Sequence, residues 1–152
     1  MVYLLGGDLA DKPAGARFRD LLDQPGILQM PGTHNGMAAL QARDAGFSAL
    51  YLSGAAMTAS MGLPDLGIIT IEEVTFFIRQ VVRASGLPVL VDGDTGYGEA
   101  LNVMNMVRTF EDAGAAAVEL ARFVWQVELR HLLGAFAVLQ RGVAGGEPVG
   151  VG

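Results

Sequence analysis

The sequence predicts an α/β fold in which short parallel strands alternate with helices. Short apolar runs alternate with amphipathic stretches across residues 14–120, and this alternation is typical of repeated strand and helix units. Glycine or a Pro-Gly pair follows most of these stretches, at positions where helices and strands usually end. The strands recur at unequal spacing, which excludes a fixed-period solenoid and leaves open half of a (β/α)8 barrel or a doubly wound sheet.

The first half of this region is expected to contain two helix and strand pairs. The expected order is helix, strand, helix and strand at residues 14–23, 27–30, 35–45 and 48–52. Phe18, Leu21 and Leu22 give the first helix one apolar side. Pro-Gly pairs follow the first helix and the first strand, and Gly46 follows the second helix in the position of a left-handed cap.

The second half is expected to begin with a loop and to continue with two more units. The loop is rich in small residues and spans residues 53–67, SGAAMTASMGLPDLG. It precedes a helix, a strand, a helix and a strand at residues 71–85, 89–92, 99–113 and 117–120. Glu72 and Glu73 occupy the first turn of the long helix, where the helix dipole favours anions, and Gly86 closes that helix.

The character of the chain changes after residue 121. Residues 122–142 have helical periodicity and no strand signal follows them, so we expect one atypical C-terminal helix there. The last residues, GVAGGEPVGVG at 142–152, are expected to form a disordered tail.

Composition excludes several classes of function. The net charge of −6 repels phosphate backbones and anionic lipid, and the ten Lys and Arg residues are scattered, so we expect no nucleic-acid and no membrane partner. With no cysteine, the chain has no disulfide, thiolate metal site or cysteine nucleophile. No run reaches the ~20 apolar residues of a membrane span, and the N-terminus lacks the pattern of a secretory signal. A soluble, cytoplasmic protein is therefore expected.

The motif VDGDTGYG at residues 91–98 places two aspartates at the end of the 89–92 strand. Side chains alternate faces along a strand, so Asp92 and Asp94 are expected to converge with only a glycine between them. Converging carboxylates need a cation, a shared proton or full hydration. Magnesium, which commonly binds one or two carboxylates and keeps several waters, fits this pair; ordinary turn chemistry is the alternative.

A second group of candidates lies at the end of the 48–52 strand. Tyr51, Ser53, Gly54 and Ala55 offer a phenol, a hydroxyl and uncovered backbone N–H groups, which can hold a carboxylate or a polarised carbonyl. A serine turn beside a core tyrosine is the structural alternative.

Weaker candidates are spread along the chain. Asp65 has the type and context of a turn or helix-cap residue, and Glu119 is a candidate third carboxylate at the same edge. His34 is a candidate proton carrier, whereas His131 is expected at the surface or in packing. Four methionines are expected to fill gaps in the core, namely Met57, Met61, Met104 and Met106.

Three runs carry a resemblance to a known family: PGTHNGMAALQARDAGF, ALYLSGAAMTASMGLPDLGIITIEEV and LPVLVDGDTGYGEALNV. In this order and spacing they resemble the isocitrate lyase and phosphoenolpyruvate mutase superfamily, most of all methylisocitrate lyases and 2,3-dimethylmalate lyases. The resemblance implies a (β/α)8 TIM-type barrel, of which about the first four strand–helix units are present. It also implies dependence on Mg²⁺, with Mn²⁺ as an alternative, and cleavage of a carbon–carbon bond in a 2-hydroxy di- or tricarboxylate to give an α-keto acid such as pyruvate.

The resemblance implies roles for individual residues. Asp92 and Asp94 match the acidic pair that holds the metal, partly through water. Ser53, Gly54 and Ala55 match the segment that binds the keto-acid portion, with Ala55 in place of a glycine that is common in relatives. Because that position acts through its backbone N–H, alanine is expected to be tolerated if its φ is negative.

Tyr51 and Asp65 match residues of the family's active-site region, but the chain departs from the family after residue 120. Relatives continue with a glutamate-aspartate-glutamine segment and a mobile loop of Lys-Lys-Cys-Gly-His type, whose cysteine is the catalytic acid or base. We therefore expect residues 1–120 to be the N-terminal half of the barrel. Residues 121–152 are expected to be non-family sequence, produced by a truncation, a change of reading frame or a partial sequence.

Three functional hypotheses follow from these observations. The first is a carbon–carbon lyase of methylisocitrate lyase type that acts on a small-molecule carboxylate. The second is a relative that hydrolyses or decarboxylates oxaloacetate or acts on phosphonopyruvate. The third is a non-catalytic fragment that self-associates, because half a barrel leaves strand edges unpaired and apolar helix faces uncovered. We accordingly expect the chain to form homo-oligomers or to aggregate. The resemblance implies tetramers, the assembly of the family.

Overall fold

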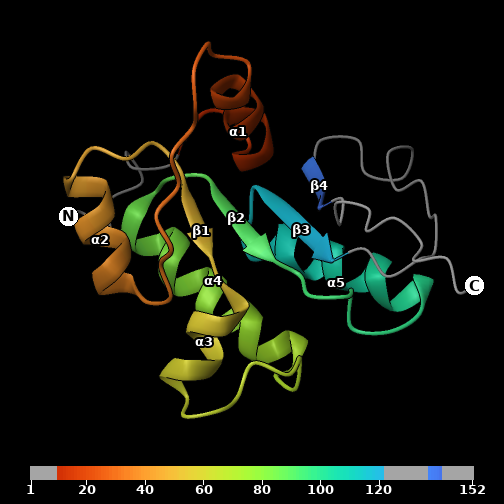
Figure 1. Cartoon of the computed structure of the whole chain (residues 1–152). Coiled ribbons are helices and arrows are strands. Elements are labelled where there is room, and N and C mark those ends of the chain that lie inside the picture. The colour runs from red at the N-terminus through yellow and green to blue at the C-terminus, as the bar shows by residue number, and fades with distance from the viewer. Residues whose placement is uncertain (1–9, 122–136, 142–152) are drawn as a thin grey trace, which may run out of the picture.

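The computed structural model describes residues 10–121 and 137–141 (Figure 1). Its helices are α1 (Ala14–Leu22), α2 (Gly36–Asp44), α3 (Gly54–Ser60), α4 (Ile71–Ser85) and α5 (Ala100–Asp112). Its strands are β1 (Leu50–Leu52), β2 (Val89–Asp92), β3 (Ala117–Ala121) and β4 (Ala137–Arg141). The predicted α/β architecture with a parallel sheet is confirmed.

The strands form one parallel sheet in the order β1-β2-β3-β4. Each strand pairs with the next one along the chain, as in a (β/α)8 barrel, whereas a doubly wound sheet reverses its strand order at a switch point. Within the described ranges the sheet is open and has four strands. Leu52 pairs with Val91, and Asp92 pairs with Glu119, so the carboxyl ends of β1, β2 and β3 lie at one edge.

Alternate side chains of the strands build two apolar clusters, one on each face of the sheet. On one face, Val89 and Val91 are fully buried in a cluster that α2, α4 and α5 complete. On the other face, Leu90 and Ala117 pack with Phe18 of α1. Figure 1 shows α1 at the end of the sheet opposite α3. The first helix therefore covers the end of the molecule that lies away from the carboxyl ends of the strands.

Helix α4 begins and ends where the sequence predicts. Its first turn carries a capping box, in which Glu73 N–H donates to Thr70 Oγ1 and Thr70 N–H donates to Glu73 Oε2. Gly86 ends the helix at a φ of 68°, the left-handed conformation that glycine adopts without strain. The buried side of the helix, which includes Val74 and Ile78, packs in the cluster shared with α2 and β2.

The strand predicted at residues 27–30 is wrong. Only Gly32, just beyond this run, pairs with β1, through an isolated parallel bridge to Tyr51. Ile27 is 91% exposed, whereas Leu28 and Met30 are partly buried against the cluster that contains Phe18, so the run packs on the sheet without pairing with it. Pro31 also has no N–H with which to extend the pairing.

The loop predicted at residues 53–67 contains the short helix α3. Ser53 is its N-cap, and the Ser53 Oγ accepts a hydrogen bond from the Ala56 N–H at 3.4 Å. Because the helix consists almost entirely of small residues, it shows none of the apolar periodicity from which a helix is predicted. The loop that actually joins α3 to α4 comprises residues 61–70 and is called the 61–70 loop below.

The atypical helix predicted at residues 122–142 is wrong for its last part, where residues Ala137–Arg141 form β4 and pair in parallel with β3. A short apolar run is compatible with helix and strand alike, and the free edge of β3 offers backbone partners that favour the strand. The rest of this predicted helix and the predicted tail lie outside the described residues. No helix in the described part of the chain has both the length and the apolar character needed to cross a membrane.

Replacing Thr70 with alanine is expected to lower the free energy of unfolding by about 1 kcal/mol, because the capping box loses the oxygen that accepts from the Glu73 N–H. Urea denaturation measures this change. Thr109→Ala is the control, since the Thr109 hydroxyl only donates to the Asn105 carbonyl within α5; it should change the free energy of unfolding by less than about 0.5 kcal/mol. Equal losses in the two variants would contradict the role given to the cap.

Candidate active site

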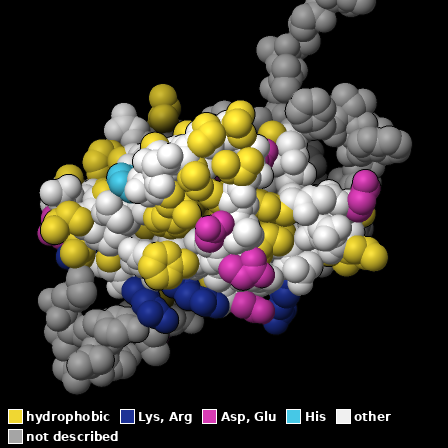
Figure 2. Space-filling view, turned by 90° about the horizontal axis from the view of Figure 1, so that it is seen from below, with side chains coloured by type: hydrophobic (Ala, Val, Ile, Leu, Met, Phe, Trp, Pro, Cys, Tyr) yellow, Lys and Arg dark blue, Asp and Glu magenta, His cyan; other side chains and the backbone are white. Residues whose placement is uncertain are grey.

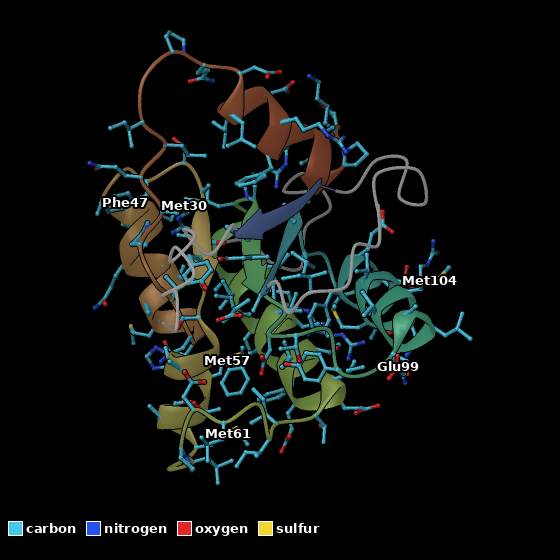
Figure 3. All side chains as sticks on the ribbon, turned by 45° about the vertical axis from the view of Figure 1, so that its right-hand side comes forward. Met30, Phe47, Met57, Met61, Glu99 and Met104 are labelled. Carbon is cyan, nitrogen blue, oxygen red and sulfur yellow. The ribbon has the colours of Figure 1, made fainter. Side chains whose placement is uncertain are left out.

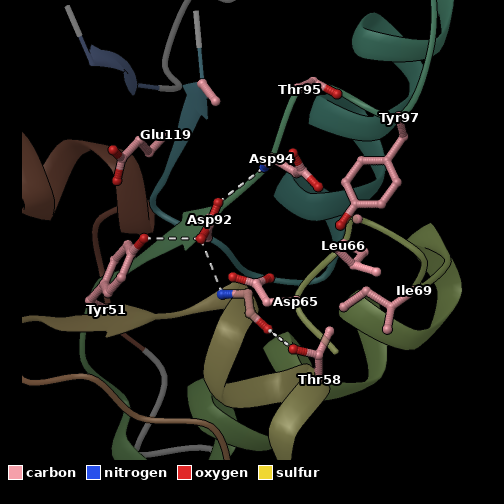
Figure 4. A pocket seen from close by; sticks show the side chains of 13 residues that line it. Tyr51, Thr58, Asp65, Leu66, Ile69, Asp92, Asp94, Thr95, Tyr97 and Glu119 are labelled. Atoms are coloured by element: carbon pink, nitrogen blue, oxygen red, sulfur yellow. Dashed lines mark hydrogen bonds between the residues drawn. The ribbon is translucent and has the colours of Figure 1, made fainter. Parts of the chain in front are cut away.

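A cavity of about 640 Å³ lies at the carboxyl ends of β1, β2 and β3. Four acidic residues line it, namely Asp65, Asp92, Asp94 and Glu119. Tyr51 and Tyr97 line it as well, and among the described residues its lining contains no Lys, Arg or His. Figure 4 shows Tyr51, Asp92, Asp94 and Tyr97 near the strand ends and Asp65 from the 61–70 loop grouped around the cavity, with Glu119 to one side.

Asp92 is the last residue of β2, and three donors fix its carboxylate. Its Oδ2 accepts from the Tyr51 hydroxyl and from the Gly54 N–H, each at 3.2 Å, and its Oδ1 accepts from the Asp94 N–H at 3.1 Å (Figure 4). These donors come from β1, from the start of α3 and from the turn after β2. A carboxylate has about four lone-pair positions, so one side of the group stays available to the cavity.

Asp94 lines the same cavity, but strand alternation is not the reason. β2 ends at Asp92, and Asp94 follows in a turn with a φ of 48°, a left-handed conformation that is uncommon for residues other than Gly, Asn and Asp. The Asp94 carbonyl accepts from the Ala121 N–H at 2.7 Å, which ties the turn to the end of β3. The two aspartates therefore reach one cavity through a turn and not along an extended strand.

Gly93 shows why a glycine separates the two aspartates. Its N–H donates to the Glu119 carbonyl at 2.8 Å. A Cβ at this position would lie within 3.0 Å of atoms in Val118, Glu119 and Leu120, so any side chain would push β3 away from the turn. The close packing of β2 on β3 therefore requires glycine here.

Tyr97 is a cavity residue that the sequence analysis missed. Its ring packs edge-on against Phe110 of α5, with 6.3 Å between the ring centroids. Burial raises the pKa of the Tyr97 hydroxyl above its ordinary value, and the negative charges of Asp94 and Asp92 raise it further. The hydroxyl is consequently neutral at physiological pH and can donate a hydrogen bond. The only signal in the sequence is its place in the run VDGDTGYG.

The other predicted site residues lie at α3 and in the 61–70 loop. Gly54 lines the cavity, whereas Ser53 caps α3 and Ala55 is an exposed residue in the first turn of α3. Ala55 has no positive φ, so the backbone there accommodates alanine, as expected. Asp65 lines the cavity from the 61–70 loop with an exposed side chain.

His34 does not lie at the cavity. His34 precedes the N-cap of α2, and its Nε2 lies 3.1 Å from the Asn35 amide nitrogen; His34 is absent from the cavity lining. His131 lies outside the described residues. Glu119, the candidate third carboxylate, does line the cavity.

The four methionines divide into a buried and an exposed pair, of which Figure 3 labels Met57, Met61 and Met104. Met57 and Met106 are fully buried, as expected. Met61 and Met104 are each 39% exposed, so the expectation of a core position is wrong for them. Met61 follows the last residue of α3 and Met104 lies on the outer side of α5, and neither position faces the sheet.

The acidic lining suits a hard divalent cation. Four carboxylates surround one cavity whose lining supplies no positive charge of its own within the described residues, and such a group is stabilised by a cation. No three His, Cys, Asp or Glu residues in this part of the chain are arranged to enclose a metal ion. Mg²⁺ does not need such a cage, because it commonly binds one or two carboxylates and keeps several waters. Asp92 and Asp94 are therefore a donor set that fits a hydrated Mg²⁺.

The face around the cavity also carries hydrophobic side chains. Figure 2 views the molecule from the end where α3 and the 61–70 loop lie, and hydrophobic side chains cover much of that face. Leu63, Leu66 and Ile68 of the 61–70 loop are 38%, 73% and 54% exposed. Leu66 also lines the cavity, so an acidic interior adjoins an apolar rim.

Known proteins match this chain over most of its length. Residues 18–124 match the family model for phosphoenolpyruvate phosphomutase. The 2-methylisocitrate lyase of Bacillus subtilis (strain 168) is 51% identical over 120 residues, which cover 79% of this chain and 40% of that enzyme.

Solved structures show the same similarity. A 2,3-dimethylmalate lyase, itself described as a PEP mutase/isocitrate lyase superfamily member, is 32% identical with a TM-score of 0.68, over 76% of this chain and 41% of that chain. A phosphonopyruvate hydrolase in complex with oxalate and Mg²⁺ is 28% identical with a TM-score of 0.70, over 78% of this chain and 42% of that chain.

The matched region contains every described side chain that lines the acidic cavity, from Tyr51 to Ala121. The chain spans about 40% of the length of the curated relatives that it matches. Fold, cavity and sequence similarity agree, and the chain belongs to the phosphoenolpyruvate mutase/isocitrate lyase superfamily.

Proposed function

We propose that this chain carries the metal-binding and keto-acid-binding part of a carbon–carbon lyase of 2-methylisocitrate lyase type. The observation that carries the proposal is the pair of Asp92 and Asp94 at one cavity, with Asp92 fixed by three hydrogen bonds. The identity to 2-methylisocitrate lyases supports it. We assign the function to residues 1–120, with Ala121 completing the cavity lining, and give the rest of residues 121–152 no part in it.

In the proposed reaction a 2-hydroxy di- or tricarboxylate is split into an α-keto acid and a second carboxylate. The hydroxyl group loses its proton to a base, and its oxygen becomes the keto oxygen as the adjacent carbon–carbon bond breaks. The electron pair of that bond passes to the departing carboxylate fragment, which an acid then protonates. From methylisocitrate the products are pyruvate and succinate.

The lining residues would share this work. Asp92 and Asp94 would hold Mg²⁺, which when bound supplies positive charge for the oxygens of the substrate. Tyr51 would keep Asp92 in position through its hydroxyl. Asp65 lines the cavity from the 61–70 loop (Figure 4). It would accept the proton of the substrate hydroxyl. The neutral hydroxyl of Tyr97 would donate to a negatively charged oxygen of the substrate.

The start of α3 (Ser53, Gly54 and Ala55) is the segment proposed to bind the keto-acid portion, and of these three residues Gly54 lines the cavity itself. The Gly54 N–H already donates to Asp92, so it would act on the substrate only through that residue. The Ser53 Oγ accepts from the Ala56 N–H and keeps its own proton for donation. The Ala55 N–H adds a second donor beside it.

One part of the reaction lacks a group in this chain. The resemblance implies that a cysteine serves as the catalytic acid or base, and the 152 residues contain no cysteine. A general acid or base typically contributes about 10²–10⁴-fold to the rate. Turnover by this chain is therefore expected to be slower than that of its longer relatives by at least that factor.

A second candidate is a reaction on phosphonopyruvate or oxaloacetate. It is supported by the likeness to a phosphonopyruvate hydrolase whose structure holds oxalate and Mg²⁺. These substrates are small carboxylates that the same acidic cavity would hold through a cation. The third candidate, a non-catalytic chain that self-associates, is supported by the exposed apolar side chains of the 61–70 loop.

With Mg²⁺ present, the full 152-residue chain is expected to release pyruvate slowly from 2-methylisocitrate, and EDTA should stop the release because it removes the cation. A lactate dehydrogenase-coupled assay measures pyruvate. Turnover of phosphonopyruvate or oxaloacetate without turnover of 2-methylisocitrate would favour the second candidate. Absence of turnover on all three, together with a single large species in light scattering, would favour the self-associating chain.

Replacing Asp94 with asparagine is expected to weaken Mg²⁺ binding by at least ~10-fold, because one of the two anionic ligands is lost. Isothermal titration calorimetry measures the affinity. Asp112→Asn is the matched control: Asp112 pairs with Arg108 on the exposed surface of α5, and its change should leave the affinity as in the wild type. An unchanged affinity in Asp94→Asn would remove Asp94 from the proposed metal site.

A further inference from the structure

The 61–70 loop meets the acidic pair at Gly67. Gly67 has a φ of 64°, and a Cβ on it would overlap the Oδ2 of Asp94 and lie 3.4 Å from its Cγ. The backbone of Gly67 therefore rests against the carboxylate of Asp94. Both residues are part of the cavity lining, so this contact belongs to the wall of the candidate site.

The backbone of Asp94 is held on both sides. Its N–H donates to the Asp92 Oδ1 at 3.1 Å, and its carbonyl accepts from the Ala121 N–H at 2.7 Å. With the backbone held in this way, the direction of the carboxylate depends on the two side-chain torsions of Asp94. Gly67 is the neighbour that decides which of those directions has room.

We propose that Gly67 is a positioning residue for the metal site, because its lack of a side chain leaves room for the Asp94 carboxylate to face the cavity beside Asp92. The inference rests on the proposed function, in which Asp94 holds Mg²⁺. A side chain at position 67 would turn the carboxylate of Asp94 aside. The sheet would not have to move, because the carboxylate is the free end of a rotatable side chain.

Gly62 offers a matched control in the same loop. It also has a positive φ, 74°, but a Cβ on it would meet nothing within 4 Å. Alanine at either position must adopt a left-handed backbone, so the two changes carry the same kind of conformational cost. Only the change at Gly67 also displaces the carboxylate of Asp94.

Calorimetric titration of the full 152-residue chain with Mg²⁺ tests the inference. Gly67→Ala is expected to weaken Mg²⁺ binding by about 10-fold or more, the usual effect of removing support for a metal ligand. Gly62→Ala should bind Mg²⁺ as the wild type does. Without metal, the melting temperatures of both variants should be lower than that of the wild type by similar amounts. The increase in melting temperature on addition of Mg²⁺ should be smaller than in the wild type only for Gly67→Ala.

Gly67→Asn and Gly62→Asn form a second matched pair. Asparagine adopts the left-handed conformation more readily than alanine and still carries a Cβ, so this pair decides the question if an alanine variant does not fold. Mg²⁺ affinity equal to that of the wild type in the Gly67 variants overturns the inference and leaves the proposed function intact. A wild-type chain that binds no Mg²⁺ overturns both.

Discussion

The carboxylate of Asp92 joins the elements that make up the cavity. It ends β2 and accepts hydrogen bonds from Tyr51 of β1, from Gly54 at the start of α3 and from Asp94 in the next turn. A half-buried carboxylate is stable only when donors or a cation compensate the loss of water. The same hydrogen bonds that stabilise this edge of the sheet therefore orient the group that is proposed to bind metal.

Three glycines allow close packing around the two aspartates. A Cβ on Gly54 would lie 3.1 Å from the Asp92 Oδ2, a Cβ on Gly93 would collide with β3, and a Cβ on Gly67 would overlap the Asp94 carboxylate. Each glycine belongs to a different segment, so the site depends on close contacts between the start of α3, the 61–70 loop and the turn after β2. The position of the acidic pair therefore depends on the absence of side chains at these three glycines.

Elements that are determined by residues close together in the sequence are predicted correctly, and elements that depend on distant segments are not. Helix α4 and strand β2 lie where predicted, because a capping box, a terminal glycine and a run of buried aliphatic residues act within a few positions. Strand pairing for residues 27–30 and 137–141 depends on distant backbone, and there the predictions of a strand and a helix are wrong. Helix α3 was missed because its small residues leave no periodic signal.

By itself the sequence determined the α/β class, the acidic pair and its place at the end of β2, because these follow from local periodicity and from the residue types of one short motif. Only the tertiary structure decided that Asp94 lies in a left-handed turn, that Tyr97 and Gly67 adjoin it, and that Ser53 and Ala55 do not line the cavity. These facts depend on contacts between segments far apart in the chain. Such contacts exist only after the strands pair and the 61–70 loop packs against the turn.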